Sequence, residues 1–337
     1  MYTSFYNLTG RPFQLTPDPR FYFDSKAHKK AMAYLTYGLS QGEGFIIITG
    51  DIGAGKTTLV GHLLDTLDTK QYVAAKVVTT QLQADDVLRM VAAAFGIDHE
   101  GADKATLLKK IEDFLLGCMS QEKRVLLIVD EAQNLPNGAL EELRMLSNFQ
   151  VDENALLQCF LLGQPQFRDR LARDPDLEQV RQRVIATYFL GPLSDAGETA
   201  NYIKHRLQRV GWNDDPTFAE ETFEKIYSYT SGVPRMLNTL CSRLLLFGYL
   251  EESHEISGKT VDDVIADLER DNELVTRPSR SPVVKVAPSS GTVERYDHIA
   301  ERVEVLEKYV KAHERTISRA LEIAEAWLSG GEQSKAE

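Results

Sequence analysis

Residues 49–58 of this sequence, TGDIGAGKTT, decide the fold class. The apolar run GFIIITG leads into them, and LVGHLLDTL, which has helical spacing, follows. The pattern G-x-x-x-x-G-K-[ST] is filled by Gly50, Gly53, Gly55, Lys56 and Thr57. Glycines let the backbone curl so that its N–H groups point at phosphate oxygens, and the start of the next helix adds a partial positive charge. The stretch therefore predicts a phosphate-binding loop between a buried strand and a helix, with a plain glycine-rich turn as the alternative.

Two side chains of this loop add chemistry to the backbone cradle. Lys56 supplies a mobile positive charge for the β- and γ-phosphates, and the Thr57 hydroxyl is the kind of group that ligates Mg²⁺. We therefore expect ATP and Mg²⁺ as ligands, with Thr57 and Asp130 on the metal. The residues expected to bind the nucleotide and its metal are Gly50, Asp51, Ile52, Gly53, Ala54, Gly55, Lys56, Thr57, Thr58 and Asp130.

An acidic pair ends the apolar run in RVLLIVDEAQNL, residues 124–135. Asp130, at the predicted strand tip, is suited to hold Mg²⁺ through water, and Glu131 is suited to orient and deprotonate an attacking water. Many nucleotide-binding proteins have the first acid but not the second. The pair therefore predicts a catalytic ATP hydrolase, whereas an acidic turn after a strand is the alternative without chemistry.

Three further polar positions are candidates for the same site. Gln164, in FLLGQPQF, follows a fourth apolar run, where the carboxyl ends of parallel strands line a ligand crevice, so it is suited to hold the attacking water or sense the γ-phosphate. Arg183 precedes a fifth run and is the first candidate to reach the γ-phosphate of a neighbouring subunit, with Arg181 the runner-up. Arg235, in SGVPRMLNTL, opens a predicted helix and is suited to fold back onto the phosphates. A surface polar side chain is the alternative at each position.

The composition is that of a globular protein with an excess of acid. The chain has 337 residues, of which 43% are hydrophobic and 26% charged, and its formal net charge is −12. This balance disfavours nonspecific nucleic-acid binding over the whole surface, although it is compatible with a local basic patch. The three cysteines are far apart in apolar segments, so we expect buried free thiols. We expect a cytoplasmic location, because we find neither a signal-peptide pattern nor an apolar run of about 20 residues.

Apolar runs of strand length alternate with helical periodicity up to Pro192. The five predicted strands lie in GFIIITG, YVAAKVVTT, RVLLIVDE, ALLQCFLLG and RVIATYFLG. This alternation predicts an α/β fold, a three-layer αβα core around a parallel sheet. After Pro192 the pattern predicts helices alone, and therefore an all-helical lid. A Pro/Ser-rich linker comes next, and then an amphipathic helix that is equally consistent with a coiled coil and with docking on its own protein.

These patterns divide the chain into five predicted parts. A helix over residues 25–41, with Ser25 as its N-cap, belongs to the first part. The parts are an N-terminal segment (1–43), the phosphate-binding core (44–192), the helical lid (193–275), the linker (276–293) and the C-terminal helix (294–330).

Taken together, the motifs resemble those of AAA+ ATPases, and more closely those of ExeA/GspA-type general secretion ATPases. The resemblance spans about residues 1–270 and is carried by PFQLTPDPRFYF, GDIGAGKTTL, VDEAQNL, LLGQPQFRDRL, RQRVIATYFLGPLS and SGVPRMLN. Within this group the opening 45 residues are most similar to the ATPase that accompanies exosortase/PEP-CTERM exopolysaccharide loci. The resemblance implies a P-loop NTPase core with a helical lid, nucleotide-dependent homo-oligomers, and a segment from Phe13 to Tyr22 that lies over the adenine.

The resemblance also sets the expected role. Secretion-type relatives carry a membrane span and a peptidoglycan-binding domain after the ATPase, whereas this sequence has the Pro/Ser linker and a short helix. We expect an ATPase that powers or regulates a cell-envelope export or exopolysaccharide system, peripheral to the inner membrane through a protein partner. The alternative is a DNA-associated ATPase similar to transposition regulators. The acidic balance disfavours it, because filaments on DNA need a lining of Lys and Arg.

Overall fold

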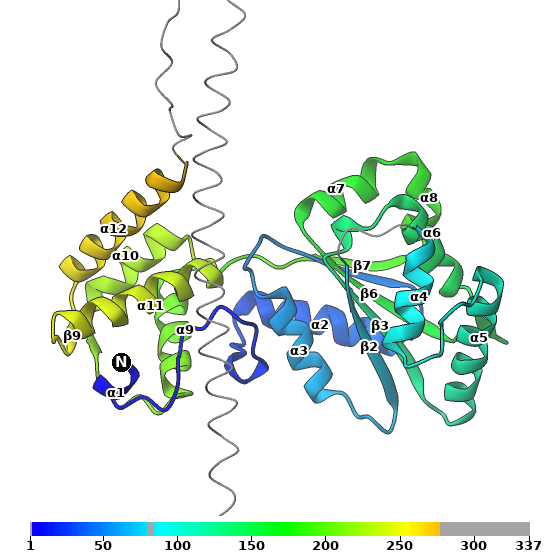
Figure 1. Cartoon of the computed structure of the whole chain (residues 1–337), viewed down its shortest axis with the longest axis horizontal. Coiled ribbons are helices and arrows are strands. Elements are labelled where there is room, and N and C mark those ends of the chain that lie inside the picture. Colours follow the sequence, from blue (N-terminus) through cyan, green and yellow to red (C-terminus); the bar gives the residue numbers. More distant parts are fainter. Residues whose placement is uncertain (1, 80–83, 277–337) are drawn as a thin grey trace, which may run out of the picture. The chain divides into compact units, whose positions relative to one another are not determined.

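The computed structural model of the protein describes residues 2–79 and 84–276. The predicted linker and C-terminal helix, from residue 277 to residue 330, lie outside the described residues and stay predictions. Figure 1 labels the elements.

A five-stranded parallel sheet lies at the centre of the phosphate-binding core, with its strands in the order β2-β3-β6-β1-β7. Its strands are β1 (Phe45–Thr49), β2 (Tyr72–Val78), β3 (Arg124–Asp130), β6 (Leu157–Gly163) and β7 (Val184–Phe189). Neighbouring strands run parallel, and Phe45 of β1 is level with Cys159 of β6 and Val184 of β7. The five strands predicted from the apolar runs are therefore confirmed.

Helices cover both faces of the sheet (Figure 1). One face packs against α2 (Lys26–Gln41) and α3 (Lys56–Thr66), and the other against α4 (Ala84–Ala94), α5 (Lys104–Ser120), α6 (Asn137–Leu146), α7 (Pro165–Arg173) and α8 (Glu178–Gln182). In β1, Ile47 faces the second group while Ile46 and Ile48 face the first. Because both faces are buried at the centre of the sheet, β1, β3 and β6 consist mostly of apolar residues, whereas the edge strands β2 and β7 are only partly buried. The predicted three-layer α/β architecture is confirmed.

Helix α2 begins where the sequence predicted. Ser25 is its N-cap, and the Ser25 side chain accepts a hydrogen bond from the backbone N–H of His28. The helix ends at Gly42, whose φ of 75° is left-handed. Ala31, Leu35 and Leu39 form its buried stripe, so the helix lies along the sheet and leads directly into β1.

Four helices form the lid: α9 (Ala196–Gln208), α10 (Glu220–Thr230), α11 (Pro234–Leu250) and α12 (Gly258–Thr276). The expectation of an all-helical lid was wrong in one detail. Strands β8 (Thr217–Phe218) and β9 (Glu255–Ile256) form a two-residue parallel pair, and fully buried Ile256 anchors it. A pair this short has no period that a sequence pattern can reveal.

The smaller elements connect the main ones. They are α1 (Tyr2–Phe5), η1 (Pro19–Phe21), η2 (Ala132–Asn134), the β4 (Gln150–Val151) and β5 (Asn154–Ala155) hairpin, and η3 (Pro175–Leu177).

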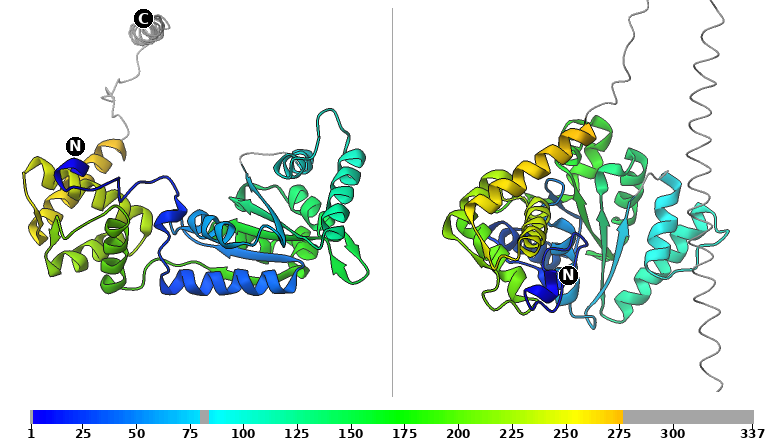
Figure 2. Two further views of the ribbon diagram at one scale, coloured as in Figure 1. Left: turned by 90° about the horizontal axis from the view of Figure 1, so that it is seen from below. Right: turned by 60° about the vertical axis from the view of Figure 1, so that its left-hand side comes forward.

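The N-terminal segment belongs to the lid by its packing. Tyr6, Phe13 and Phe21 lie in the same buried cluster as the lid helices, whereas α2 packs on the sheet. Figure 2 shows the segment running from the lid helices to α2. The segment predicted as residues 1–43 therefore divides between two hydrophobic cores.

The chain passes between the sheet and the lid twice, just before α2 and just after β7. A single buried carboxylate joins the two passages. Glu198 of α9 accepts hydrogen bonds from the backbone N–H of Lys26 at 2.7 Å and of Ser194 at 2.8 Å.

Candidate functional site

The glycine-rich loop connects the end of β1 to the start of α3. Gly53 and Gly55 have φ angles of 86° and 98°, which side chains rarely tolerate. A Cβ on Gly53 would lie 2.3 Å from Cβ of Arg235, and a Cβ on Gly50 would lie 2.5 Å from the carbonyl oxygen of Leu190. The loop is thus a tight backbone concavity that requires glycine at these positions, as a phosphate cradle does.

Lys56 opens α3 and its side chain folds back over the loop. Its Nζ donates to the carbonyl oxygens of Gly50, at 2.7 Å, and Asp51, at 3.1 Å. Burial lowers the pKa of Lys56, while the nearby charges of Glu131, Asp130 and Asp51 oppose that shift. The ammonium group is therefore held beside the concavity where phosphate oxygens are expected.

Asp130 lies at the tip of β3 and is 3% exposed. Its Oδ2 accepts from Thr57 Oγ1 at 2.9 Å and pairs with Lys76 Nζ at 2.9 Å. The structure thus joins the two predicted metal ligands and adds a cation from β2, which compensates for the burial of the carboxylate. Sequence reasoning missed Lys76, although it is the single charged residue in YVAAKVV.

Glu131 follows in the left-handed conformation, with φ 58° and ψ 39°. Its Oε2 accepts a hydrogen bond from Gln133 Nε2, and Gln133 Oε1 accepts from the backbone N–H of Gln164 at 3.0 Å. One amide side chain therefore links the two candidate catalytic residues. Gln133 was also missed, and its place in VDEAQNL was the available signal.

A cavity of about 190 Å³ gathers these groups with others distant in the sequence. Its walls come from the N-terminal segment, the glycine-rich loop, the ends of β3 and β6, and the lid. They include Asp18, Tyr22, Lys56, Glu131, Gln164 and Arg235. One cavity is thus lined by both predicted binding segments. These are the segment expected over the adenine and the glycine-rich loop expected at the phosphates.

The three arginine candidates have different locations. Arg235 opens α11, its backbone N–H donates to the Gly53 carbonyl at 3.2 Å, and its side chain is exposed at the cavity. Arg183 lies at the amino end of β1, whereas the glycine-rich loop follows the carboxyl end of that strand. The Arg183 carbonyl accepts a hydrogen bond from the N–H of Phe45, the first residue of β1. Its guanidinium donates to Asn148 Oδ1. Arg181 pairs with Glu178 and donates to the Leu171 carbonyl at 3.0 Å. Neither Arg181 nor Arg183 is brought to the chain's own glycine-rich loop.

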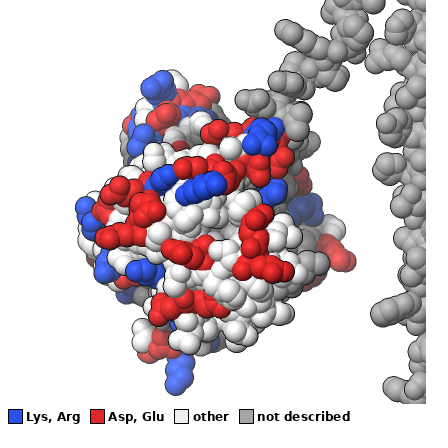
Figure 3. Space-filling view, turned by 90° about the vertical axis from the view of Figure 1, so that its left-hand side faces the viewer, with Lys and Arg blue, Asp and Glu red and all other residues white. Residues whose placement is uncertain are grey.

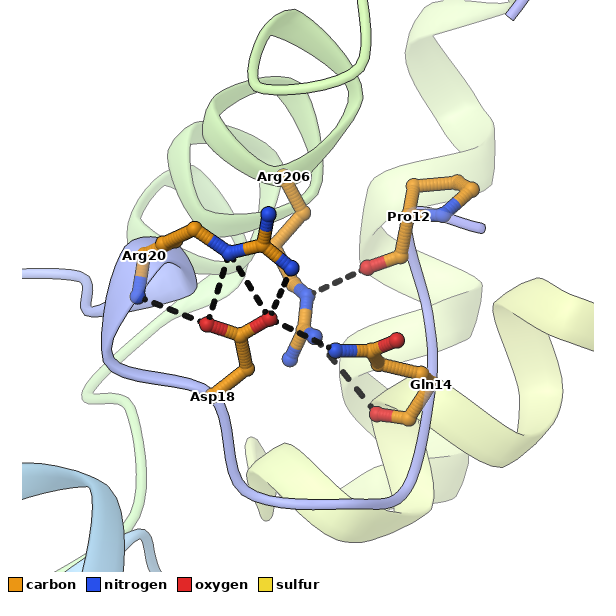
Figure 4. A network of polar contacts seen from close by, with 5 residues as sticks. All are labelled: Pro12, Gln14, Asp18, Arg20 and Arg206. Carbon is orange, nitrogen blue, oxygen red and sulfur yellow. Dashed lines mark hydrogen bonds and ion pairs between the residues drawn. The ribbon is translucent and has the colours of Figure 1, made fainter. Parts of the chain in front are cut away.

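Arg206 of α9 attaches the N-terminal segment to the lid (Figure 4). It is 6% exposed, its Nε donates to the Pro12 carbonyl at 2.6 Å, and its Nη1 donates to the Tyr202 hydroxyl at 2.8 Å. Its guanidinium also lies 4.6 Å from the centre of the Phe21 ring, a cation–π distance. This buried cation thus orders the segment that walls one end of the cavity.

Asp18 organises the turn of the same segment (Figure 4). Its carboxylate accepts from Arg20 Nη2 at 2.7 Å and from Gln14 Nε2 at 3.0 Å. The hydrogen bond from Arg20 is the main cause that lowers the pKa of Asp18. The turn therefore presents a fixed, ionised carboxylate at the cavity wall.

These residues fit a nucleotide with Mg²⁺. Phosphates match the glycine cradle, Lys56 and the start of α3, and Mg²⁺ prefers oxygen ligands such as those of Thr57 and Asp130. The described residues hold no group of three or more His, Cys, Asp or Glu side chains arranged for a metal. Mg²⁺ is usually held by one or two protein groups together with waters and substrate phosphates.

Comparisons with known proteins agree with this geometry. Residues 39–171 match the family model of the AAA domain. The chain is 38% identical over 257 residues to General secretion pathway protein A of Aeromonas hydrophila, and the match covers 76% of this chain and 46% of that protein. The chain therefore spans less than half the length of this relative.

Solved structures show the same fold at low sequence identity. The Aeropyrum pernix ORC2 protein in its ADPNP–ADP complexes has a TM-score of 0.57 and 16% identity, over 76% of this chain and 71% of that chain. Drosophila ORC bound to DNA has a TM-score of 0.58 and 14% identity, over 80% and 67%. Among the residues that the structure describes, we find no helix with the length and apolarity that a membrane span requires. The parallel sheet and the glycine-rich loop at the carboxyl end of β1 form a P-loop α/β fold, and residues 39–171 within it match the AAA domain.

Proposed function

We propose that the chain binds ATP with Mg²⁺ in the described cavity and hydrolyses it. The observation that carries this proposal is that Lys56, Thr57 and Glu131 line one cavity at the edge of the sheet, with Asp130 hydrogen-bonded to Thr57. A protein that only held a nucleotide would not need a second acid beside the metal-binding one. The loop residues from Gly50 to Thr58 supply the phosphate contacts in this proposal.

Each residue has a separate task in the reaction. Lys56 and the loop N–H groups hold the phosphates; Thr57 and Asp130 would hold Mg²⁺, which would supply positive charge to the phosphate oxygens. Glu131 orients a water and accepts its proton as the water oxygen bonds to the γ-phosphorus and the bond to the β–γ bridging oxygen breaks. Gln164 and Arg235 contact the γ-phosphate side from β6 and from the lid.

Two variants test this division of tasks. Lys56→Ala should abolish or severely weaken ATP binding, whereas Glu131→Gln should bind ATP and lose turnover. Lys70→Ala, at an exposed position after α3, is the matched control. Hydrolysis by Glu131→Gln within about threefold of wild type, a barrier difference of roughly 0.7 kcal/mol, would contradict the assignment.

We further propose that Arg183 completes the site of a neighbouring copy in a homo-oligomer. Its position at the edge of the sheet away from its own loop supports a role in trans. Turnover per chain should then rise with protein concentration, and Arg183→Ala should bind ATP yet hydrolyse it slowly. Mixing Arg183→Ala with Lys56→Ala chains should restore part of the activity, because some interfaces pair an intact loop with an intact arginine. If the variants assemble together and activity does not return, Arg183 does not act in trans.

We propose a role in a cell-envelope export system, and within that class an exopolysaccharide system of the PEP-CTERM type. The similarity to a general secretion protein supports the broader role. The chain would act in the cytoplasm and reach the inner membrane through a protein partner. The Glu131→Gln variant, held in its ATP state, should retain that partner during purification, and a membrane polysaccharide component would support the narrower proposal.

DNA binding is the competing function, since a structural neighbour was solved on DNA. The charge of the lid disfavours it. Residues 193–275 contain 16 acidic and 8 basic residues, and Figure 3 shows several acidic patches spread over the lid face with fewer basic ones. DNA contacts need Lys and Arg beside the phosphates. ATP turnover stimulated by DNA, with a steep loss of the effect as salt increases, would favour the competing function.

A further inference from the structure

His28 is a buried histidine in the first turn of α2, and the roles proposed above do not use it. It is 6% exposed and lines the same cavity as Lys56 and Tyr22. Its Nδ1 lies 2.7 Å from Ser25 Oγ, and Ser25 Oγ also accepts from the backbone N–H of His28 at 3.1 Å.

The contact with Ser25 is linked to which ring nitrogen of His28 carries the hydrogen. The Ser25 hydroxyl has one hydrogen to donate, and its oxygen already accepts a backbone N–H. Among the described residues, Nδ1 of His28 is the acceptor within reach of that hydrogen. The contact is satisfied when the hydroxyl donates to Nδ1, and this arrangement, on which the inference below rests, places the ring hydrogen on Nε2. Burial also lowers the pKa of His28 to about 4, so the ring is neutral near pH 7.

The Nε2–H group points at the glycine-rich loop. A Cβ on Gly55 would lie 2.8 Å from Nε2 of His28, so this glycine leaves the space that the imidazole occupies. On its other side, His28 meets the edge of the Tyr22 ring at a centroid distance of 5.8 Å. Within residues 2–79 and 84–276, no acceptor forms a hydrogen bond with this Nε2–H. A fixed donor is thus located between the phosphate end and the N-terminal wall of the cavity.

We propose that His28 binds the nucleotide directly, by donating a hydrogen bond from Nε2 to an oxygen where the ribose meets the α-phosphate. This inference rests on the proposed nucleotide site, in which phosphates occupy the loop and the base lies toward Tyr22. The junction between them must then pass His28. Ser25 is a positioning residue, because its hydroxyl selects the tautomer that donates.

The position of this contact predicts which steps His28 affects. ATP and ADP share the ribose and the α-phosphate, so the contact strengthens both complexes equally. An interaction present equally before and during the reaction changes binding and leaves the chemical step unchanged. His28 should therefore affect nucleotide affinity and KM, and leave kcat within about twofold.

Two substitutions separate the donor from the rest of the ring. His28→Asn retains a polar atom near Nδ1 that can meet Ser25 but lacks the distal donor, whereas His28→Gln places an amide near the position of Nε2. His62→Asn is the matched control, because His62 stacks on Tyr22 at 3.9 Å and does not line the cavity. Calorimetry with unlabelled Mg²⁺–ADP and a non-hydrolysable ATP analogue avoids a label on the ribose.

We expect His28→Asn to weaken both ligands by about tenfold or more, as for a lost hydrogen bond to a charged group. His28→Gln should recover part of the loss, and His62→Asn should bind within about twofold of wild type. If His28→Asn binds normally while Lys56→Ala does not, this inference is wrong and the proposed nucleotide site stands. If Lys56→Ala also binds normally, the proposed function itself fails.

The tautomer supplies a test that needs no variant. In ¹⁵N spectra of the full-length protein with labelled histidine, the ring of His28 should carry its hydrogen on Nε2, and the Nε2 resonance should shift when Mg²⁺–ADP is added. A ring protonated on Nδ1, or an Nε2 resonance that ADP leaves unchanged, would overturn the inference.

Discussion

Replacing Arg206 with methionine should loosen the N-terminal segment from the lid. Methionine fills much of the same space without the guanidinium, so the packing of α9 against α11 should survive. The change removes the donor to the Pro12 carbonyl and the cation above the Phe21 ring. The effect should therefore concentrate in the segment that walls the cavity.

The magnitude follows from these two contacts. A buried carbonyl left without its donor costs about 1–3 kcal/mol, and a desolvated cation–π contact contributes about 2 kcal/mol. Part of this is offset, because Arg206 is a buried cation paired with neutral acceptors and its removal relieves a desolvation cost. We expect a net loss of about 2–3 kcal/mol in docking the segment, which is roughly 30- to 150-fold in the undocking equilibrium.

Hydrogen exchange measures this equilibrium directly. The backbone N–H groups of Thr9 and Tyr22 are bonded to Val210 and Pro19, so exchange in peptides covering residues 5–25 should accelerate by that factor. Nucleotide affinity should fall as well. The control is Arg209→Met, one position after α9 and exposed, which should leave exchange unchanged. Unaltered exchange in Arg206→Met would show that the apolar contacts of the segment are sufficient without the cation.

Three further outcomes are expected. Lys76→Met removes the ammonium beside Asp130, so the Mg²⁺ concentration for half-maximal ATP binding should fall by about threefold or more. Titration of Mg²⁺ measures this concentration, and a higher value than in wild type would contradict the prediction. Gln133→Leu breaks the link between Glu131 and Gln164, so kcat should fall about tenfold with little change in ADP affinity. An equal loss of kcat and of ADP affinity would instead indicate misfolding. Burial lowers the pKa of His28 from 6.5 to about 4, so the unfolded state takes up the proton first as pH falls below 6.5. The free energy of unfolding should therefore decrease by about 2 kcal/mol by pH 5. Urea unfolding of His28→Asn should show a smaller decrease with pH, and an equal decrease would show that His28 is not responsible.

Local patterns in the sequence were sufficient for the sheet and the phosphate loop. The central strands β1, β3 and β6 are mostly apolar runs because they are buried on both faces, and the loop needs glycine at particular spacings. Asp130 and Glu131 were found for the same reason, since they follow one such strand directly. In each case the physical requirement lies within about ten neighbouring residues.

The remaining parts of the site depend on contacts between distant segments. Arg206 reaches Pro12 across 194 positions, and Lys76 reaches Asp130 from the neighbouring strand. In the sequence, Arg206 is one of several charged residues on an amphipathic helix, and His28 resembles any polar residue in a first turn. Their burial and their partners follow from the fold, so spacing along the chain could not single them out.

The carboxylate of Glu198 has a mechanical consequence. A body attached by one flexible connection can rotate about three axes, whereas two connections fastened side by side leave one axis along the line that joins them. Glu198 fastens the passages at Lys26 and Ser194 to the same helix. We therefore expect rotation of the lid against the sheet to be restricted to turning about the line that joins these two passages.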